Sequence, residues 1–169
     1  CPTIAALQMD MGAAGVCAAK ISEAAIMLAA GIPSVLITSP IATFAKARAL
    51  NALLAQYPEH QLLMVIDSDQ GLAALQNALN AESRLGLLVD IDLKMGRTGT
   101  REVETMLRLI DAIATDERFD FRGIQHYAGH LMHIEDYAKR RDKSLASWAR
   151  LDEFFAALDE RGIPCDIVT

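Results

Sequence analysis

The sequence predicts an α/β protein built as a parallel (β/α) TIM-type barrel that is incomplete within this chain. Short apolar runs alternate with longer helical patterns along the whole chain, as in consecutive βα units. These runs are apolar on both faces, which is typical of parallel strands that are covered on both sides. Polar residues gather where the runs end, at the edge of a parallel sheet where ligands bind in barrels and in open doubly wound sheets alike.

The number of strands favours an incomplete barrel over an open doubly wound sheet. Strands are expected at 16–20, 34–39, 62–67, 85–92, 121–127 and 164–169, and helices at 3–11, 23–30, 42–56, 69–80, 101–115 and 137–161. A closed barrel has eight strands. We therefore expect residues 1–169 to be a single domain, an internal segment with about six of the eight strands, one or more lying before Cys1 and one or more after Thr169.

Composition narrows the class of protein. The chain has 169 residues, of which 52% are hydrophobic, and its formal net charge is −6. An acidic chain without a basic patch is not expected to bind nucleic acid. No apolar run approaches the about 18 residues that span a bilayer, so no membrane association is expected. Three scattered cysteines fit a reducing compartment, which predicts a cytoplasmic location.

The stretch from Leu88 to Thr100 carries the most chemistry. Asp90 and Asp92 are two residues apart, so on a strand both carboxylates would lie on one face. Two glycines then flank Arg97, and such a tight loop fixes where the guanidinium lies. The carboxylates could act as general acid and base. We favour a structural interpretation, in which Asp92 anchors the loop through backbone hydrogen bonds and Asp90 pairs with a neighbouring layer.

Other candidate residues have simpler interpretations. Lys20 and Lys94 could form a Schiff base, but a structural role is preferred for both. His126, His130 and His133 lie close in sequence and could bind zinc; a histidine that lines a substrate pocket is the favoured alternative. The apolar side chains of the long last helix, among them Trp148, Leu151, Phe154, Phe155 and Leu158, are expected to be core.

Three segments resemble one family, the alanine-racemase-like, fold-type III pyridoxal-phosphate enzymes. These carry Asp-Thr-Gly-Met-x-Arg-x-Gly after a strand; Asp92, Met95, Arg97 and Gly99 keep this spacing, while Lys94 stands where the family has glycine. Residues 15–32 resemble the family's second strand and helix. Residues 123–130 resemble a strand of the branch that holds D-threonine aldolase, 3-hydroxy-D-aspartate aldolase and D-serine dehydratase.

The resemblance implies pyridoxal 5'-phosphate as cofactor and gives candidate cofactor-binding residues. Arg97 would hydrogen-bond the phenolic oxygen, Tyr127 would lie beside the cofactor, Gln125 would shape the pocket, and Thr169 would precede the phosphate loop. The family's Schiff-base lysine would lie before Cys1, so the catalytic residues are unknown and this segment alone is expected to be inactive. A divalent metal, if the complete enzyme uses one, would be bound by residues outside this chain.

The function that follows is a pyridoxal-phosphate-dependent lyase acting on D-amino acids, most simply a D-threonine aldolase-like enzyme that cleaves β-hydroxy D-amino acids. A D-serine or 3-hydroxyaspartate dehydratase and an amino-acid racemase are the enzymatic alternatives. From another class, the pyridoxal-phosphate homeostasis proteins bind the cofactor on the same barrel without clear catalysis; an unrelated phosphate-binding barrel is a third possibility. The complete enzyme is expected to be a homodimer.

Overall fold

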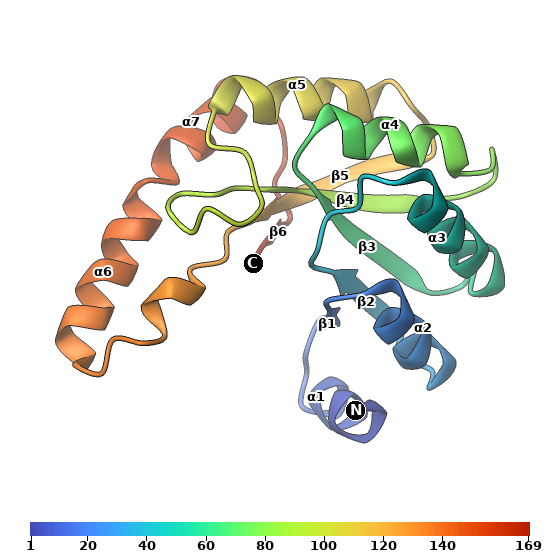
Figure 1. Cartoon of the computed structure of the whole chain (residues 1–169), viewed down its shortest axis with the longest axis horizontal. Helices are drawn as coiled ribbons and strands as arrows, with labels where there is room; N and C mark the ends of the chain where they lie inside the picture. The colour runs from blue at the N-terminus through green and yellow to red at the C-terminus, as the bar shows by residue number, and fades with distance from the viewer.

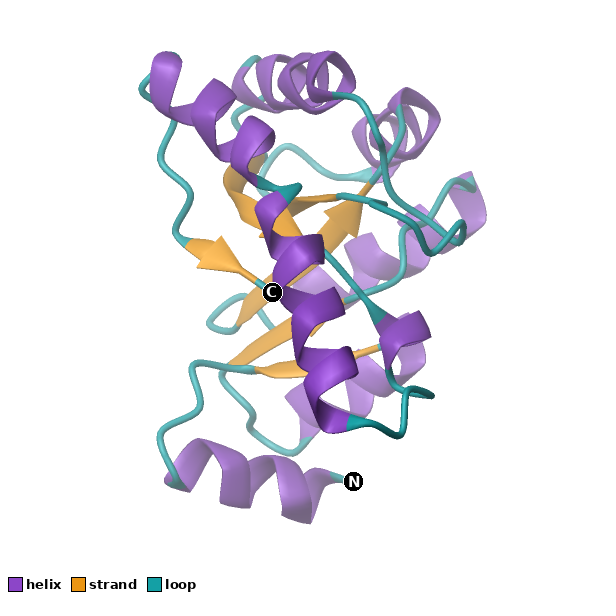
Figure 2. Ribbon diagram, turned by 90° about the vertical axis from the view of Figure 1, so that its left-hand side faces the viewer, coloured by secondary structure: helices purple, strands orange, loops and turns teal.

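The strands form one parallel sheet in which neighbours in sequence are neighbours in space. The computed structural model describes residues 1–169, and the sheet order is β1-β2-β3-β4-β5-β6. The strands are β1 (Val16–Ala18), β2 (Ser34–Ile37), β3 (Gln61–Ile66), β4 (Leu85–Asp90), β5 (Phe119–Gln125) and β6 (Ile167–Val168). All adjacent pairs are parallel. A doubly wound sheet reverses its strand order, whereas this sheet does not and curls as half of a barrel (Figure 2), which confirms the predicted fold class.

Helices alternate with the strands along the chain, and most of them cover the outer face of the curled sheet, as Figure 1 shows. They are α1 (Pro2–Asp10), α2 (Ile21–Ala29), α3 (Phe44–Gln56), α4 (Asp69–Ala78), α5 (Val103–Ala114), the 3₁₀ turn η1 (Gly129–Leu131), α6 (Tyr137–Ala149) and α7 (Asp152–Glu160). The main core, 33 buried residues, includes residues of the strands and of the helices packed on them. A separate cluster of four buried residues, Leu36, Leu63, Val65 and Leu88, comes from β2, β3 and β4 alone. Because side chains alternate along a strand, this second cluster occupies the inner face of the half-barrel.

The single helix predicted at 137–161 is wrong: the segment forms α6 and α7, separated at Arg150 and Leu151. There the helical hydrogen bonds shorten to i→i−3, from Arg150 N–H to the Ser147 carbonyl and from Leu151 N–H to the Trp148 carbonyl. The break places a fully buried Leu151 against the core, with α7 packed on α5, while α6 has no buried residue. Trp148 is 47% exposed, so its predicted place in the core is also wrong.

The last predicted strand is shorter than expected. Of residues 164–169 only Ile167–Val168 pair with β5, opposite Gly123 and Ile124. Gly123 has φ of +146°, and a Cβ there would lie 1.9 Å from the Ile167 carbonyl oxygen, so this close pairing requires glycine. No helix of the chain combines the length and the apolar character needed to cross a bilayer.

Candidate active site

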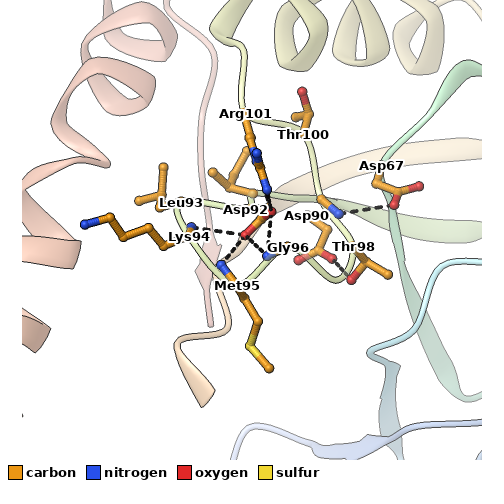
Figure 3. Close-up of polar contacts among 12 residues, drawn as sticks. Asp67, Asp90, Asp92, Leu93, Lys94, Met95, Gly96, Thr98, Thr100 and Arg101 are labelled. Atoms are coloured by element: carbon orange, nitrogen blue, oxygen red, sulfur yellow. Dashed lines mark hydrogen bonds and ion pairs between the residues drawn. The ribbon is translucent and has the colours of Figure 1, made fainter. Parts of the chain in front are cut away.

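The loop that joins β4 to α5 is built around the carboxylate of Asp92. Its Oδ1 accepts hydrogen bonds from the backbone N–H groups of Lys94, Met95 and Gly96, at 3.1, 2.6 and 3.1 Å. Its Oδ2 accepts two more from Arg101, with Nη2 at 2.7 Å (Figure 3). The predicted anchoring role of Asp92 is confirmed, and Arg101 is a partner that the sequence prediction missed.

The pKa of Asp92 reflects this set of donors. Burial alone would raise the pKa of the carboxyl, because a charge loses solvation in the protein. The bonds from Arg101 and from the three backbone N–H groups outweigh burial and hold the pKa below its ordinary value. Asp92 therefore remains a carboxylate and is not poised to transfer protons.

Asp90 ends β4 and binds a different set of partners. Thr98 Oγ1 donates to Asp90 Oδ2 at 2.7 Å, and Gln125 Nε2 donates to Asp90 Oδ1 at 2.9 Å. Burial raises the pKa of Asp90 above its ordinary value, although both hydrogen bonds and the charge of Arg97 oppose the shift. The predicted pairing of Asp90 with a neighbouring element is confirmed, with Thr98 as a second partner that was not foreseen.

A third carboxylate holds the far end of the loop. Gly99 N–H donates to Asp67 Oδ2 at 3.2 Å, across from the end of β3 (Figure 3). Gly99 has φ of +107°, and a Cβ there would lie 2.7 Å from the Asp92 backbone nitrogen. Only glycine fits this position, so three carboxylates and one glycine define the course of the loop.

Arg97 lies at the tip of the loop that these contacts fix. Its guanidinium carbon stands 4.8 Å from the centroid of the Tyr127 ring, a cation–π arrangement between the segments that follow β4 and β5. Arg97 forms no hydrogen bond or ion pair within the chain, and its side chain is exposed. The guanidinium N–H groups are therefore free to bind an external acceptor.

The hollow beside Arg97 is polar. It has a volume of about 420 Å³ and no hydrophobic side chain in its lining, which consists of Asp67, Asp92, Gly96, Arg97, Thr98, Gly99 and Arg101. Lys20 does not belong to it. That lysine precedes α2 and lines a separate cavity of about 580 Å³ between α2 and α3.

Gln125 lies deeper than Arg97 and Tyr127. It is 4% exposed, and besides Asp90 its Nε2 reaches the Thr38 carbonyl oxygen, 3.4 Å away at the end of β2. This contact crosses the inner face from β5 to a strand that is not its neighbour in the sheet. Gln125 thus joins three strand ends beneath the loop, and its direct contact with a cofactor stays a prediction.

Thr169 is exposed and follows β6. Its backbone N–H donates to the Ile124 carbonyl, and its carbonyl oxygen accepts from His126 N–H at 2.6 Å. These contacts use the backbone alone. The role predicted for Thr169 at the cofactor also stays a prediction.

The three histidines after β5 do not converge. His126 Nδ1 lies 3.1 Å from the Ile91 carbonyl oxygen and Nε2 lies 2.8 Å from Ser147 Oγ, so both ring nitrogens have protein partners. His130 and His133 are exposed. No group of three or more His, Cys, Asp or Glu side chains in the chain is arranged to hold a metal ion, so the zinc alternative has no geometric support.

The amino-acid sequence of the chain was compared with protein families and with known proteins. The family model described as "Alanine racemase, N-terminal domain" matches residues 2–169. The chain is 31% identical to a D-threonine aldolase of an Arthrobacter species, over all of the chain and 44% of that enzyme. It is also 31% identical to the 3-hydroxy-D-aspartate aldolase of Paracoccus denitrificans (strain Pd 1222), over 94% of the chain and 41% of that enzyme.

Among solved structures, the D-threonine aldolase of Filomicrobium marinum superposes with a TM-score of 0.90 at 31% identity, covering 98% of this chain and 44% of that protein. The chain therefore spans less than half the length of the relatives that it matches.

Proposed function

Because the chain belongs to the alanine racemase N-terminal domain family, we propose that it supplies the cofactor-facing strands of a pyridoxal-phosphate-dependent lyase that cleaves β-hydroxy D-amino acids. The observation that carries the proposal is the free guanidinium of Arg97, fixed by its loop and stacked on Tyr127 at the carboxyl ends of the strands. The two aldolases at 31% identity, one named for D-threonine and one for 3-hydroxy-D-aspartate, support the substrate class.

The side chains at this site fit a planar, anionic aromatic cofactor. Arg97 offers N–H donors with no internal acceptor, and a guanidinium stays charged at all working pH values, so it can hold a phenolate oxygen without titrating. The ring of Tyr127 packs against the guanidinium, and Tyr127 is itself 44% exposed. The bound cofactor would supply an electron sink for breaking a bond at the substrate Cα.

The other residues of the site would position Arg97. Asp92 and Asp67 fix the two ends of the loop, and Asp90 holds its middle through Thr98. A loop fixed at three points keeps the guanidinium at one place relative to the sheet, and holding a group in the productive geometry in advance lowers the entropy cost of the reaction. No residue of this chain is proposed as the proton-transfer group.

The test uses the purified full-length protein with Arg97→Ala and, as the matched variant, Arg97→Lys. We expect Arg97→Ala to bind the cofactor at least about tenfold more weakly, because one charge-assisted contact is worth about 1.5–3 kcal/mol. Arg97→Lys should recover part of the affinity. Dialysis followed by the visible absorbance of retained pyridoxal phosphate measures this, and equal retention in all three proteins would contradict the assignment of Arg97.

Product analysis separates the alternatives. D-Threonine should give glycine and acetaldehyde in equal amounts if the enzyme is an aldolase. Ammonia and 2-oxobutanoate would instead identify a dehydratase, and a change of configuration at Cα without cleavage would identify a racemase. Cofactor binding by the full-length protein with none of these products, from any β-hydroxy D-amino acid offered, would favour a non-catalytic cofactor-binding protein.

A further inference from the structure

A second cavity lies on the other side of the β4–α5 loop, between that loop, η1 and α6. Its volume is about 300 Å³, and it is lined by Lys94, His130, Leu131, Ile134, Lys143, Ala146, Ser147 and Arg150. It shares no lining residue with the hollow beside Arg97. Lys94 extends away from Asp90 and Thr98, so the two sides of one loop face two different spaces (Figure 3).

The lining is strongly basic in a chain whose net charge is −6. Lys94, Lys143 and Arg150 contribute three positive charges, His130 adds ring nitrogens, and no carboxylate lines the cavity. None of the three cations forms an ion pair within the chain, although the chain has seven such contacts elsewhere. Like charges gathered around one space create a positive potential there, which favours an anion.

Two contacts fix the walls of this cavity. Arg150 Nη1 donates to the Leu93 carbonyl oxygen, so the guanidinium is held against the start of the loop. Ser147 Oγ lies 2.8 Å from His126 Nε2, and the other ring nitrogen of His126 contacts the Ile91 carbonyl. α6 has no buried residue, so these polar contacts, more than core packing, hold its last turn beside the loop.

We propose that this cavity binds a compact phosphate-class dianion, either inorganic phosphate or a small phosphate monoester. Three cations from a loop and one helix suit a group with negative charge on several oxygens. The volume is at the lower end of the about 300–1,000 Å³ of small-molecule pockets, and the side chains of Leu131 and Ile134 could contact the organic part of a monoester. The site is separate from the cofactor site, so it stands or fails independently of the proposed function.

Isothermal titration calorimetry with inorganic phosphate and with glycerol 1-phosphate tests the site, on protein first saturated with pyridoxal phosphate to fill any cofactor phosphate site. The variant is Lys143→Gln. The matched control is Lys139→Gln, which removes the same charge from the same helix outside the cavity. We expect Lys143→Gln to raise Kd at least about fivefold and Lys139→Gln less than about 1.5-fold, since one partly exposed charge pair contributes about 1 kcal/mol.

The two ligands distinguish the source of the phosphate. Tighter binding of glycerol 1-phosphate would identify a monoester site, whereas equal or weaker binding would identify a site for free phosphate. The proposal is overturned if wild-type protein binds neither ligand at millimolar concentration, if Lys143→Gln binds as well as wild type, or if Lys139→Gln loses as much affinity as Lys143→Gln. Circular dichroism melts of both variants show whether α6 is intact.

Discussion

The segments that follow β4 and β5 both reach the candidate site, but they are held in different ways. The loop after β4 is held along its length by the carboxylates of Asp67, Asp90 and Asp92, which accept from its backbone and side-chain donors. After β5, Tyr127 is 44% exposed and its hydroxyl has only a 3.7 Å contact with the Met132 sulfur. The Arg97 loop is fixed by carboxylates, two of them buried, whereas the Tyr127 side chain has only surface contacts.

The difference assigns separate tasks to the two segments. A fixed loop can hold Arg97 at one position, which suits a group that must meet the same cofactor atom in every turnover. A loosely held Tyr127 can adjust as a ligand enters. The comparison therefore predicts that substitutions in the loop after β4 affect folding and cofactor binding together, whereas removing the Tyr127 hydroxyl affects stability little.

The largest effect is expected for Asp92→Ala. This change leaves three backbone N–H donors and Arg101 without their buried acceptor, and losing several bonds to one charged group at once costs about 3 kcal/mol of unfolding free energy. Urea denaturation followed by circular dichroism measures the loss. The control is Asp69→Ala, which removes an exposed ion pair with Arg108 and should cost less than about 1 kcal/mol. Similar losses in the two variants would contradict the anchoring role of Asp92.

The second effect is a pH dependence of opposite sign at Asp90 and Asp92. The folded pKa of Asp92 is lowered, so its stabilisation is present above the ordinary carboxyl value of about 3.9 and is lost as pH falls through the folded value. The folded pKa of Asp90 is raised, because burial outweighs its hydrogen bonds. The contribution of Asp90 to stability is therefore complete below the ordinary carboxyl pKa, and it is lost as the pH rises through the folded pKa.

Asparagine variants measured at a series of pH values test these signs. The stability deficit of Asp92→Asn relative to wild type should shrink as the pH is lowered from 6 toward 3. The deficit of Asp90→Asn should instead shrink as the pH is raised over the same range. Deficits that change in the same direction would show that the two carboxylates do not differ as described.

The smallest effects come from removing one hydroxyl in each segment. Thr98→Val removes the donor to the buried Asp90 and should cost about 1 kcal/mol. Tyr127→Phe removes only the weak contact with Met132 and keeps the ring beneath Arg97, so we expect less than about 0.5 kcal/mol. Thermal melts of the two variants make the comparison, and a larger loss in Tyr127→Phe would reverse it.

Local sequence pattern was enough for the sheet and for part of the loop. The continuous apolar runs at 62–67 and 85–92 predicted β3 and β4, because strands covered on both faces must be apolar on both. The favoured interpretation of Asp92 as the residue that anchors the loop backbone is confirmed, since its donors lie only two to four residues away in the sequence. The placement of Arg97 on this loop came from the same motif.

Contacts between distant segments could not be predicted in this way. Gln125 reaches Thr38 across 87 residues, and Asp67 reaches Gly99 across 32, so neither pairing leaves a local pattern. The break between α6 and α7 at Arg150 and Leu151 could not be predicted from local pattern either. Helical periodicity continues through it, and what interrupts the helix is the fit of Leu151 into the core and of Arg150 against Leu93.

The amino-acid sequence by itself determined the parallel α/β plan and the family motif around Arg97, because hydrophobic periodicity and glycine positions act over a few residues. The tertiary structure alone decided which groups surround each carboxylate, that Arg97 lies over Tyr127, and that three cations meet beside α6. The physical reason is that burial and charge depend on neighbours that only the curled sheet brings together.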